Sequence, residues 1–495
     1  MNSFVRLSVL AFLCLAALEA QSTSTLGWSR YLRGGDFDVA TNVVVEPSGD
    51  VWVAGHSSGK YEAYGPNEPY QLTNAGKSDI FLVKYRINPD GTATTLFFTW
   101  LGGADNEQLA DMKLDAQGRV VLTGITNSSN FPMAGAPFQN IAGGDFDVFV
   151  SIVDPNQGGA MSLAYSTYYG GTGRELAKAL AIGPTGNIAV VGTTTADGIP
   201  GATSGAQPNR RGNSDAFVIY FNPRENSLSY SSYLGGNGND TAVGVAIDRN
   251  NRIWFVGSTG SDDFPLTDNG VQMSSTGFFD GYLAAVDPAL RGLASFYYGT
   301  LLGGSRSDEA RSLAIDGNGK IWVSGITFSE DLPVTANAAQ RSLAGGTDAF
   351  VMQIDPLQQG TAALLYSSYV GGTGFEFVYG MSLIDNTRVV LAGYSMSGQL
   401  PTTSNAVKKT PASAFADGMV AVLNSAVAGA AGLEYMSYFG GSSTDVINSV
   451  SFDPANPKVL FVAGYTSSLD LQTTDGTTRE NAAPAPNAFA AKLIR

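Results

Sequence analysis

The chain contains a single cysteine, Cys14, and a single histidine, His56, among its 495 residues. Cys14 lies inside an N-terminal apolar run, so the exported chain would have no disulfide and no cysteine-based metal site. Zinc sites built on His/Cys clusters and histidine-based catalytic triads are excluded in the same way. We expect His56 to be a packed or rim residue.

Charged residues are also scarce, at 14% of the chain, and acidic residues outnumber basic ones for a net charge of -15. Binding to nucleic acid requires a basic face, and docking on anionic membranes requires basic segments. We therefore expect neither partner. The chain is rich instead in glycine, with 60 residues, and in aromatics, at 11%. This composition suits an all-β protein with many tight turns.

Only one long apolar run is present, from Leu7 to Leu18, and it follows Arg6. Such a run is too short to span a bilayer, and its position is typical of a secretory signal peptide. We predict a signal peptide over residues 1–20, cleaved after Ala20, and a secreted, extracellular or periplasmic protein. No membrane insertion is expected after cleavage.

The dominant feature of the sequence is repetition. A Gly-Gly pair recurs seven times, in steps of 65 to 69 residues, with its first glycine at Gly34, Gly102, Gly170, Gly235, Gly303, Gly371 and Gly440. A Gly-x-Thr/Ser motif and an Asp that opens a short apolar segment keep the same phase. A fixed period of this size indicates a repeat architecture, in which these glycines would have a structural role.

The third repeat shows four short apolar segments separated by Gly, Pro and Asn, a pattern typical of strands. We name them A (163–169), B (176–182), C (188–191) and D (216–221). Four antiparallel strands repeated seven times predict an all-β, seven-bladed β-propeller, forming one domain over residues 21–495.

The connections suggest how the blades are built. Three are short, and we predict that the long C–D loop crosses from the outer strand of one blade to the inner strand of the next. Each blade would then read D, A, B, C from the axis outward. The C-terminal strand, residues 488–494, would pair with the N-terminal strands and close the ring without open edges.

The fourth repeat carries several motifs in register, namely Tyr230-Ser-Ser-Tyr-Leu-Gly-Gly, Val245-Ala-Ile-Asp, Gly257-Ser-Thr, Asp263-Phe-Pro and Asp280-Gly-Tyr. These motifs resemble the bacterial SBBP repeat, named for a seven-bladed β-propeller, and the resemblance covers nearly all of residues 26–495. It implies a secreted or surface-exposed bacterial propeller. It implies no catalytic residues, because the family has no settled ones.

Two series of carboxylates recur in phase with the repeat. The first opens strand D at Asp79, Asp147, Asp215, Asp280, Asp348 and Asp417. The second lies five residues beyond the first glycine of each pair, at Glu107, Glu175, Asp240, Asp308, Glu376 and Asp445. We expect the first series to ring the channel mouth on the face that carries the A–B turns and C–D loops, here called the top face.

These carboxylates allow a functional and a structural interpretation. Clustered oxygens suit Ca²⁺, and two carboxylates suffice for glycoside hydrolysis. Alternatively, each carboxylate accepts backbone N–H bonds from its own loop or the next blade. We favour the structural interpretation, because a residue present in every blade meets a need of every blade.

Departures from the repeat are the candidate binding residues. The first C–D loop contains an aromatic and polar cluster, the third contains two cations, and two aromatics flank Glu376 in the sixth A–B turn. Aromatic rings beside amides and carboxylates can bind sugars or peptides, although packing against the blades is the alternative. The candidates are Tyr61, Glu62, Tyr64, Asn67, Tyr70, Arg210, Arg211, Phe375 and Phe377.

The sequence thus favours an exported, monomeric propeller that binds a protein or glycan on its top face, or acts as a surface scaffold, without catalysis. Ca²⁺ is the one cofactor considered. The alternative is a carboxylate-based hydrolase or lyase acting on polysaccharide. Paired acids in a top-face cleft, outside the sevenfold pattern, would favour the enzyme, and acids that all cap loops would favour binding.

Overall fold

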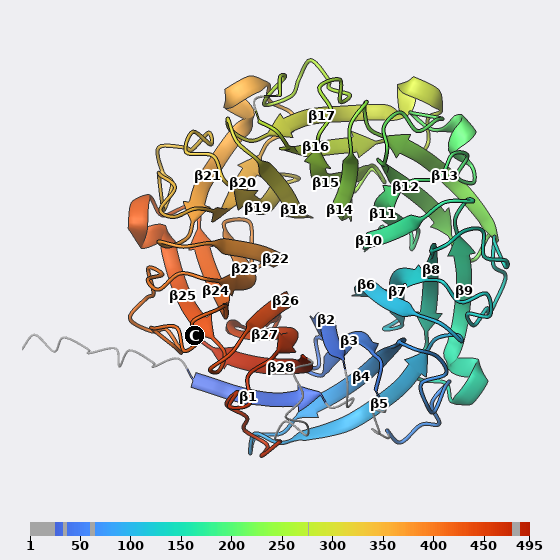
Figure 1. Cartoon of the computed structure of the whole chain (residues 1–495), viewed down its shortest axis with the longest axis horizontal. Helices are drawn as coiled ribbons and strands as arrows, with labels where there is room; N and C mark the ends of the chain where they lie inside the picture. The colour runs from blue at the N-terminus through green and yellow to red at the C-terminus, as the bar shows by residue number, and fades with distance from the viewer. Residues whose placement is uncertain (1–24, 33–36, 60–64, 276, 478–485) are drawn as a thin grey trace, which may run out of the picture.

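The computed structural model describes residues 25–32, 37–59, 65–275, 277–477 and 486–495. They form seven four-stranded antiparallel sheets arranged around a central axis (Figure 1). The chain is therefore an all-β, seven-bladed β-propeller, as the sequence predicts. The predicted signal peptide, residues 1–20, lies outside the described residues.

The four strands of each blade fall into four concentric layers (Figure 1). The innermost strands are β2 (Asp38–Val45), β6 (Glu107–Leu114), β10 (Glu175–Ile182), β14 (Asp240–Ile247), β18 (Asp308–Ile315), β22 (Glu376–Leu383) and β26 (Asp445–Asp453). The second strands are β3 (Val51–Ser57), β7 (Val120–Thr126), β11 (Ile188–Thr194), β15 (Ile253–Thr259), β19 (Ile321–Thr327), β23 (Arg388–Ser395) and β27 (Asn456–Thr466).

The outer half of each blade comprises a buried third strand and an outermost strand. The third strands are β4 (Asp79–Ile87), β8 (Asp147–Val153), β12 (Asp215–Asn222), β16 (Asp280–Val286), β20 (Asp348–Ile354), β24 (Asp417–Asn424) and β28 (Asn487–Ile494). The outermost strands are β1 (Thr25–Leu32), β5 (Ala93–Leu101), β9 (Leu163–Tyr169), β13 (Ser227–Leu234), β17 (Phe296–Leu302), β21 (Leu364–Val370) and β25 (Leu433–Phe439).

Short 3-10 helices complete the described secondary structure, namely η1 (Gly159–Ser162), η2 (Ala202–Ser204), η3 (Gly292–Ser295), η4 (Gly360–Ala363) and η5 (Gly429–Gly432). None of the helices in the described part of the chain has the length and apolar character to cross a membrane. We number the blades in chain order, so that blade 1 is β2–β5, blade 6 is β22–β25, and blade 7 combines β26–β28 with β1.

The predicted order of strands within a blade is wrong. The B strands lie innermost and the order is B, C, D, A, so the D strands are third from the axis. The link between blades is the short Gly-Gly turn, which joins the outermost strand β9 of blade 2 to the innermost strand β10 of blade 3. The long C–D loop, in contrast, stays within its own blade.

The C–D loops protect the outer edges of the blades. In blade 2 the loop between β7 and β8 runs beside β9, where Ser166 N donates to Ala134 O at 3.0 Å and Tyr168 N donates to Gln139 O at 3.0 Å. An unpaired strand edge is a template for aggregation, and these bonds occupy part of it. This explains why the loop length hardly changes between repeats.

The predicted ring closure is confirmed, although its position differs. The C-terminal strand β28 lies between β27 and β1 and pairs with both, for example Asn487 with Thr466 and Lys492 with Trp28. Blade 7 is therefore built from both ends of the chain, which meet in Figure 1. Strand β28 is the third strand of that blade and not the innermost one.

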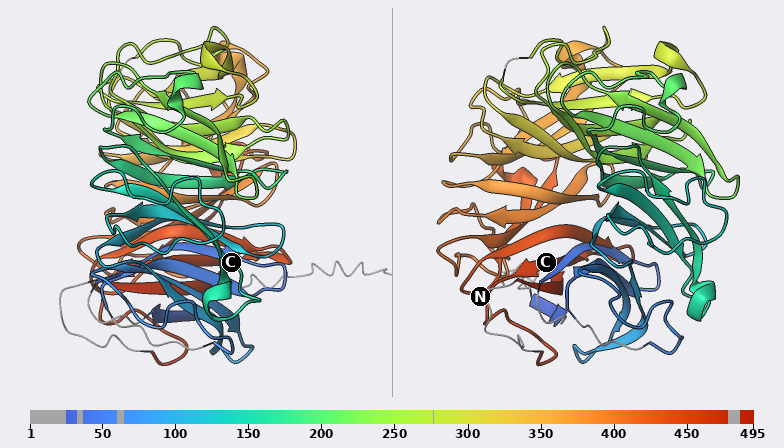
Figure 2. Two further views of the ribbon diagram at one scale, coloured as in Figure 1. Left: turned by 90° about the vertical axis from the view of Figure 1, so that its right-hand side faces the viewer. Right: turned by 45° about the vertical axis from the view of Figure 1, so that its right-hand side comes forward.

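The hydrophobic core is divided among the blade interfaces. Seven clusters of buried side chains each combine residues of two neighbouring blades, and the cluster between blades 7 and 1 brings Trp28 and Phe461 together with Phe81. The third strands lie between two such clusters, so β8 is buried at every position. Burial on both faces explains the continuous apolar runs of the D segments. Side views show the blades stacked around the ring (Figure 2).

Candidate functional site

The two carboxylate series meet at the junctions between blades. Asp147 opens β8 of blade 2 and Glu175 opens β10 of blade 3, and a Cβ atom added to Gly170 would collide with both carboxyl groups. Glycine at this position therefore leaves space for two acids. The same carboxyl junction joins Asp79 with Glu107, Asp215 with Asp240, Asp280 with Asp308, Asp348 with Glu376, and Asp417 with Asp445.

Both acids of a carboxyl junction hold backbone together. Glu175 accepts a hydrogen bond from Gly171 N at 2.7 Å and from Thr194 Oγ1 at 2.7 Å. Asp147 Oδ2 accepts from Gly143 N at 2.9 Å. The two carboxyl groups thus fix the Gly-Gly turn and the end of the C–D loop, which is the structural role favoured from the sequence.

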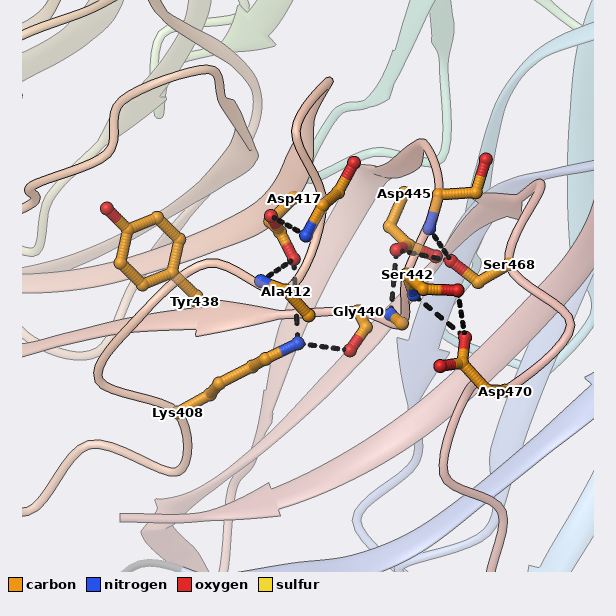
Figure 3. A network of polar contacts seen from close by, with 12 residues as sticks. Lys408, Ala412, Asp417, Tyr438, Gly440, Ser442, Asp445, Ser468 and Asp470 are labelled. Atoms are coloured by element: carbon orange, nitrogen blue, oxygen red, sulfur yellow. Dashed lines mark hydrogen bonds and ion pairs between the residues drawn. The ribbon is translucent and has the colours of Figure 1, made fainter.

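A glutamine of the C–D loop completes most of these junctions. Gln207 Nε2 donates to Asp215 Oδ2 at 2.7 Å, while its Oε1 accepts from Gly235 N at 3.1 Å. In blade 6 this place belongs to Lys408, whose Nζ donates to Gly440 O at 2.6 Å and lies 3.5 Å from Asp417 Oδ1 (Figure 3). The recurring Gln therefore serves the fold.

Burial, with a smaller contribution from the partner acid, raises the pKa of acids in the carboxyl junctions. Burial raises the pKa of Asp348 to about 7. The backbone hydrogen bond from Ala344 opposes this shift, and the negative charge of Glu376 adds to it. Burial likewise raises the pKa of Asp445 to about 6, against hydrogen bonds that lower it, and Asp417 contributes its negative charge. Oδ1 of Asp348 and Oδ1 of Asp445 are buried without a hydrogen-bond partner. A proton shared within the pair would satisfy such atoms.

The carboxyl junctions do not form a ring at the channel mouth, so that prediction is wrong. The D-strand acids lie on the third strands, away from the axis, and Asp79 and Asp215 have no exposed surface. Within the described residues, no group of three or more Asp, Glu, His or Cys side chains is placed to hold a metal ion. Calcium binding by these acids remains a hypothesis of the sequence alone.

The central channel offers a different site. It is a cavity of about 800 Å³ lined by side chains of all seven innermost strands. Each of these strands contains a β-bulge at its fourth residue, as at Lys178, where the pairing of β10 with β11 shifts between Ala177 and Ala179. A bulge re-aims a side chain and is often found beside functional sites.

The seven bulged residues all line the channel, and we call them the bulge ring. In blade order they are Thr41, Ala110, Lys178, Val243, Arg311, Tyr379 and Asn448. No two are alike, whereas the carboxyl junctions nearly repeat from blade to blade. In the channel lining, the bulge ring is therefore a place where the sevenfold symmetry of the protein is broken.

The residues next to the bulges connect neighbouring blades around the axis. Asp111 accepts hydrogen bonds from Asn42 Nδ2 at 2.9 Å and from Leu180 N at 3.0 Å, which ties blade 2 to blades 1 and 3. Ser449 Oγ accepts from Val43 N at 3.2 Å across the closure. These bonds hold the backbone of the bulge ring in place.

Two cations of the bulge ring face the channel. Lys178 of blade 3 and Arg311 of blade 5 are separated around the ring by Val243 of blade 4. Arg311 Nη2 donates to Glu309 Oε2 at 2.6 Å, whereas no carboxylate of the described residues pairs with Lys178. Desolvation, and then the positive charge of Arg311, lower the pKa of Lys178.

An aromatic wall adjoins Arg311. The Arg311 guanidinium lies over the Tyr379 ring, with 5.4 Å between its carbon and the ring centroid. The ring centroids of Tyr379 and Tyr394 are 6.0 Å apart. The Tyr394 ring stacks on that of Phe377, with 5.0 Å between the centroids and 16° between the ring planes. Burial raises the pKa of Tyr394 to about 12. We call Phe377, Tyr379 and Tyr394 the aromatic wall.

The opposite side of the channel, in blade 1, is polar. Thr41 Oγ1, Asn42 Oδ1 and His56 Nδ1 are buried atoms with no hydrogen-bond partner, and Arg311 Nε is a fourth such atom in the channel lining. Burial lowers the pKa of His56 to about 4, so the imidazole is neutral at pH 7. Buried polar groups are normally satisfied, and each exception requires an explanation.

The structure describes two of the five candidate residues of the first loop, Asn67 and Tyr70. Tyr61, Glu62 and Tyr64 lie outside the described residues. Asn67 donates from Nδ2 to Pro155 O at 2.9 Å, and Tyr70 packs against the cluster between blades 1 and 2. The described part of this loop therefore contacts the neighbouring blade.

The remaining candidates lie on other blades. Arg210 pairs with Asp197 at 2.9 Å and donates to Asn213 O at 3.0 Å within its own loop, while the neighbouring Arg211 is exposed. Phe375 is 44% exposed in the turn before β22. Of all the candidates, only Phe377 belongs to the aromatic wall beside the channel. None of the bulge-ring residues was among the candidates from the sequence.

Residues 230–265 match the family model described as SBBP, a beta-propeller repeat. This stretch starts in β13, continues through β14 and β15, and ends in the following loop. The chain carries the SBBP repeat. The motifs of the fourth repeat quoted above fall mostly within the matched residues.

Two known proteins resemble this SBBP-repeat propeller more distantly. The regulatory protein FlaEY of Caulobacter vibrioides is 26% identical over 345 residues, which cover 66% of this chain and 34% of FlaEY. The chain thus matches about a third of that relative's length. A solved structure of a luciferin-regenerating enzyme aligns with 94% of this chain and 95% of its own, at 10% identity and a TM-score of 0.33. That similarity carries no functional argument.

Proposed function

We propose that the protein is an exported, non-catalytic binding module whose ligand, a glycan or part of a macromolecule, occupies the central channel. One observation carries this proposal. All seven blades contribute a different residue to the bulge ring that lines the channel, and four buried polar atoms without partners belong to residues of this lining. A volume of about 800 Å³ lies within the usual range of ligand sites.

The position of the acids supports binding over catalysis. An acid pair that hydrolyses a glycosidic bond must reach the bond from both sides. The acids of the carboxyl junctions are buried and occupied with backbone N–H groups, as Asp147 and Glu175 illustrate. Among the described residues, Asp111 is the one carboxylate in the channel lining, and it is held by Lys113 and Asn42. Export follows from the predicted signal peptide.

Val243→Trp tests the proposal, because an indole at this position of the bulge ring would fill the channel between Lys178 and Arg311. The mature protein and the variant would be applied to glycan and peptide arrays. We expect the variant to lose the ligand that the wild type binds. Leu293→Trp, on an outer helix where Leu293 is 77% exposed, is the control and should keep it.

Melting temperatures and sheet content of both variants would establish that they fold. Binding that survives in a folded Val243→Trp protein would contradict a channel site. The same conclusion would follow if Leu293→Trp alone abolished binding.

A further inference from the structure

We propose that the channel ligand is a sugar that carries a carboxylate, such as the uronic acid of an acidic polysaccharide, seated between Lys178, Arg311 and Tyr379. This inference deepens the proposed function and rests on it. It assigns to the channel a ligand class that includes one negative charge, several hydroxyl groups and an apolar ring face.

The charge of the channel argues for an anion. Its lining contains three cations, of which Lys113 pairs with Asp111 at 2.7 Å and Arg311 with Glu309 at 2.6 Å. Lys178 has no such partner among the described residues. Lys178 is an exposed residue of the channel lining, and a carboxylate would supply an opposite charge and strong charge-assisted hydrogen bonds.

Arg311 offers a second contact to the same group. Its Nη2 donates to Glu309 and its Nε is buried, but the residue lines the channel and its guanidinium adds a second positive charge there. The two cations repel each other, since the positive charge of Arg311 helps to lower the pKa of Lys178. One anion between them would interact favourably with both and would relieve their mutual repulsion.

The remainder of the lining suits a sugar ring. Tyr379 stands beside Arg311 in the bulge ring and is 37% exposed, so part of its ring is available for contact. Across the channel, Asn42 Oδ1 and His56 Nδ1 lack hydrogen-bond donors. Both atoms have no exposed surface, so sugar hydroxyls would reach them only after a side-chain rotation, and the neutral imidazole can then accept such a bond.

The experiment is isothermal titration of the mature protein with glucuronate, glucose, oligogalacturonate and inorganic phosphate. We expect glucuronate or oligogalacturonate to bind, and glucose and phosphate to bind at least about tenfold more weakly, because each lacks one half of the recognition. Lys178→Met should weaken binding of the acidic sugar by about tenfold or more. Lys178→Arg should restore most of the affinity.

Lys409→Met is the matched control, since Lys409 is an exposed lysine on the loop between β23 and β24. It should leave the affinity unchanged. Equal binding by Lys178→Met and wild type would overturn the assignment of Lys178. Equal binding of phosphate and glucuronate would overturn the assignment of a sugar ligand and would leave only an anion site.

The outcome for neutral ligands separates the two proposals. A neutral glycan or a peptide that binds the wild type and is lost in Val243→Trp would support the channel site and overturn the acidic-sugar ligand. If neither acidic sugar binds at concentrations where an array ligand saturates, the acidic-sugar ligand is also overturned.

Discussion

Asp348 and Glu376 open strands in neighbouring blades, and their carboxyl groups both lie where a side chain of Gly371 would have to be. Gln340 Nε2 donates to Asp348 Oδ2 at 2.6 Å, and Gly372 N donates to Glu376 Oε2 at 2.7 Å. Two acids in one buried space remain stable when they share a proton, as like charges at short distance resist full ionisation. The carboxyl junctions therefore couple the stability of the ring to pH.

The first prediction concerns this coupling. Asp348 keeps its proton in the folded chain up to a pKa of about 7, against an ordinary value of 3.8. The folded chain thus binds more protons than the unfolded chain between these values, so its stability should fall as pH rises through this interval. Melting temperatures should be higher at pH 5 than at pH 8.

Asp348→Asn should reduce this pH dependence and raise the free energy of unfolding at pH 8 by about 1–3 kcal/mol, since one pKa unit is worth about 1.4 kcal/mol. An amide can donate to Glu376 as a protonated acid would. The chain itself places Asn487 at the start of β28, in the position held by Asp elsewhere. Denaturant titrations at both pH values provide the measurement.

Asp145→Asn removes the same charge from an exposed residue of the loop before β8 and serves as the control. It should leave the pH profile unchanged. A profile of Asp348→Asn identical to that of the wild type would contradict proton sharing at this junction.

The second prediction concerns the space at a carboxyl junction. Gly170→Ala should destabilise the protein by about 1–3 kcal/mol, because the added methyl group collides with the carboxyl groups of Asp147 and Glu175 and overpacking carries a cost of this size. Gly398→Ala is the matched control, since nothing lies within 4 Å of its added Cβ. Thermal and denaturant unfolding of both variants would be compared. Equal stability of the two variants would contradict this prediction, because it would show that the two carboxyl groups can move to accommodate a methyl group.

The third prediction concerns ring closure. Removal of residues 487–495 deletes β28, which separates β27 from β1 in blade 7. The truncated chain should leave β1 without its only strand partner, expose two edges and aggregate or melt at a markedly lower temperature. Size-exclusion chromatography and a melting curve would detect this. A truncated protein that stays monomeric and melts like the full chain would be incompatible with the closure described here.

The arrangement of the blades shows where inference from loop lengths fails. The Gly-Gly turn between β9 and β10 is short and yet joins two blades, whereas the long loop between β11 and β12 returns to the same sheet. Loop length limits the distance between strand ends but does not say which sheet they enter. The long loop was needed to cover the outer edge, and only the hydrogen bonds to β9 and its counterparts reveal this.

The sequence by itself determined the seven blades, the strand pattern and the ring closure, because each repeat must bury the same apolar faces and turn at the same glycines. The bulge ring was within reach as well, since Lys178, Arg311 and Tyr379 each stand eight residues beyond Gly170, Gly303 and Gly371 respectively. Only the tertiary structure decided that this position faces the axis and that Asp and Glu of successive blades share one space. Both facts depend on which strand lies innermost, and that is set by packing between blades, which involves residues far apart in the chain.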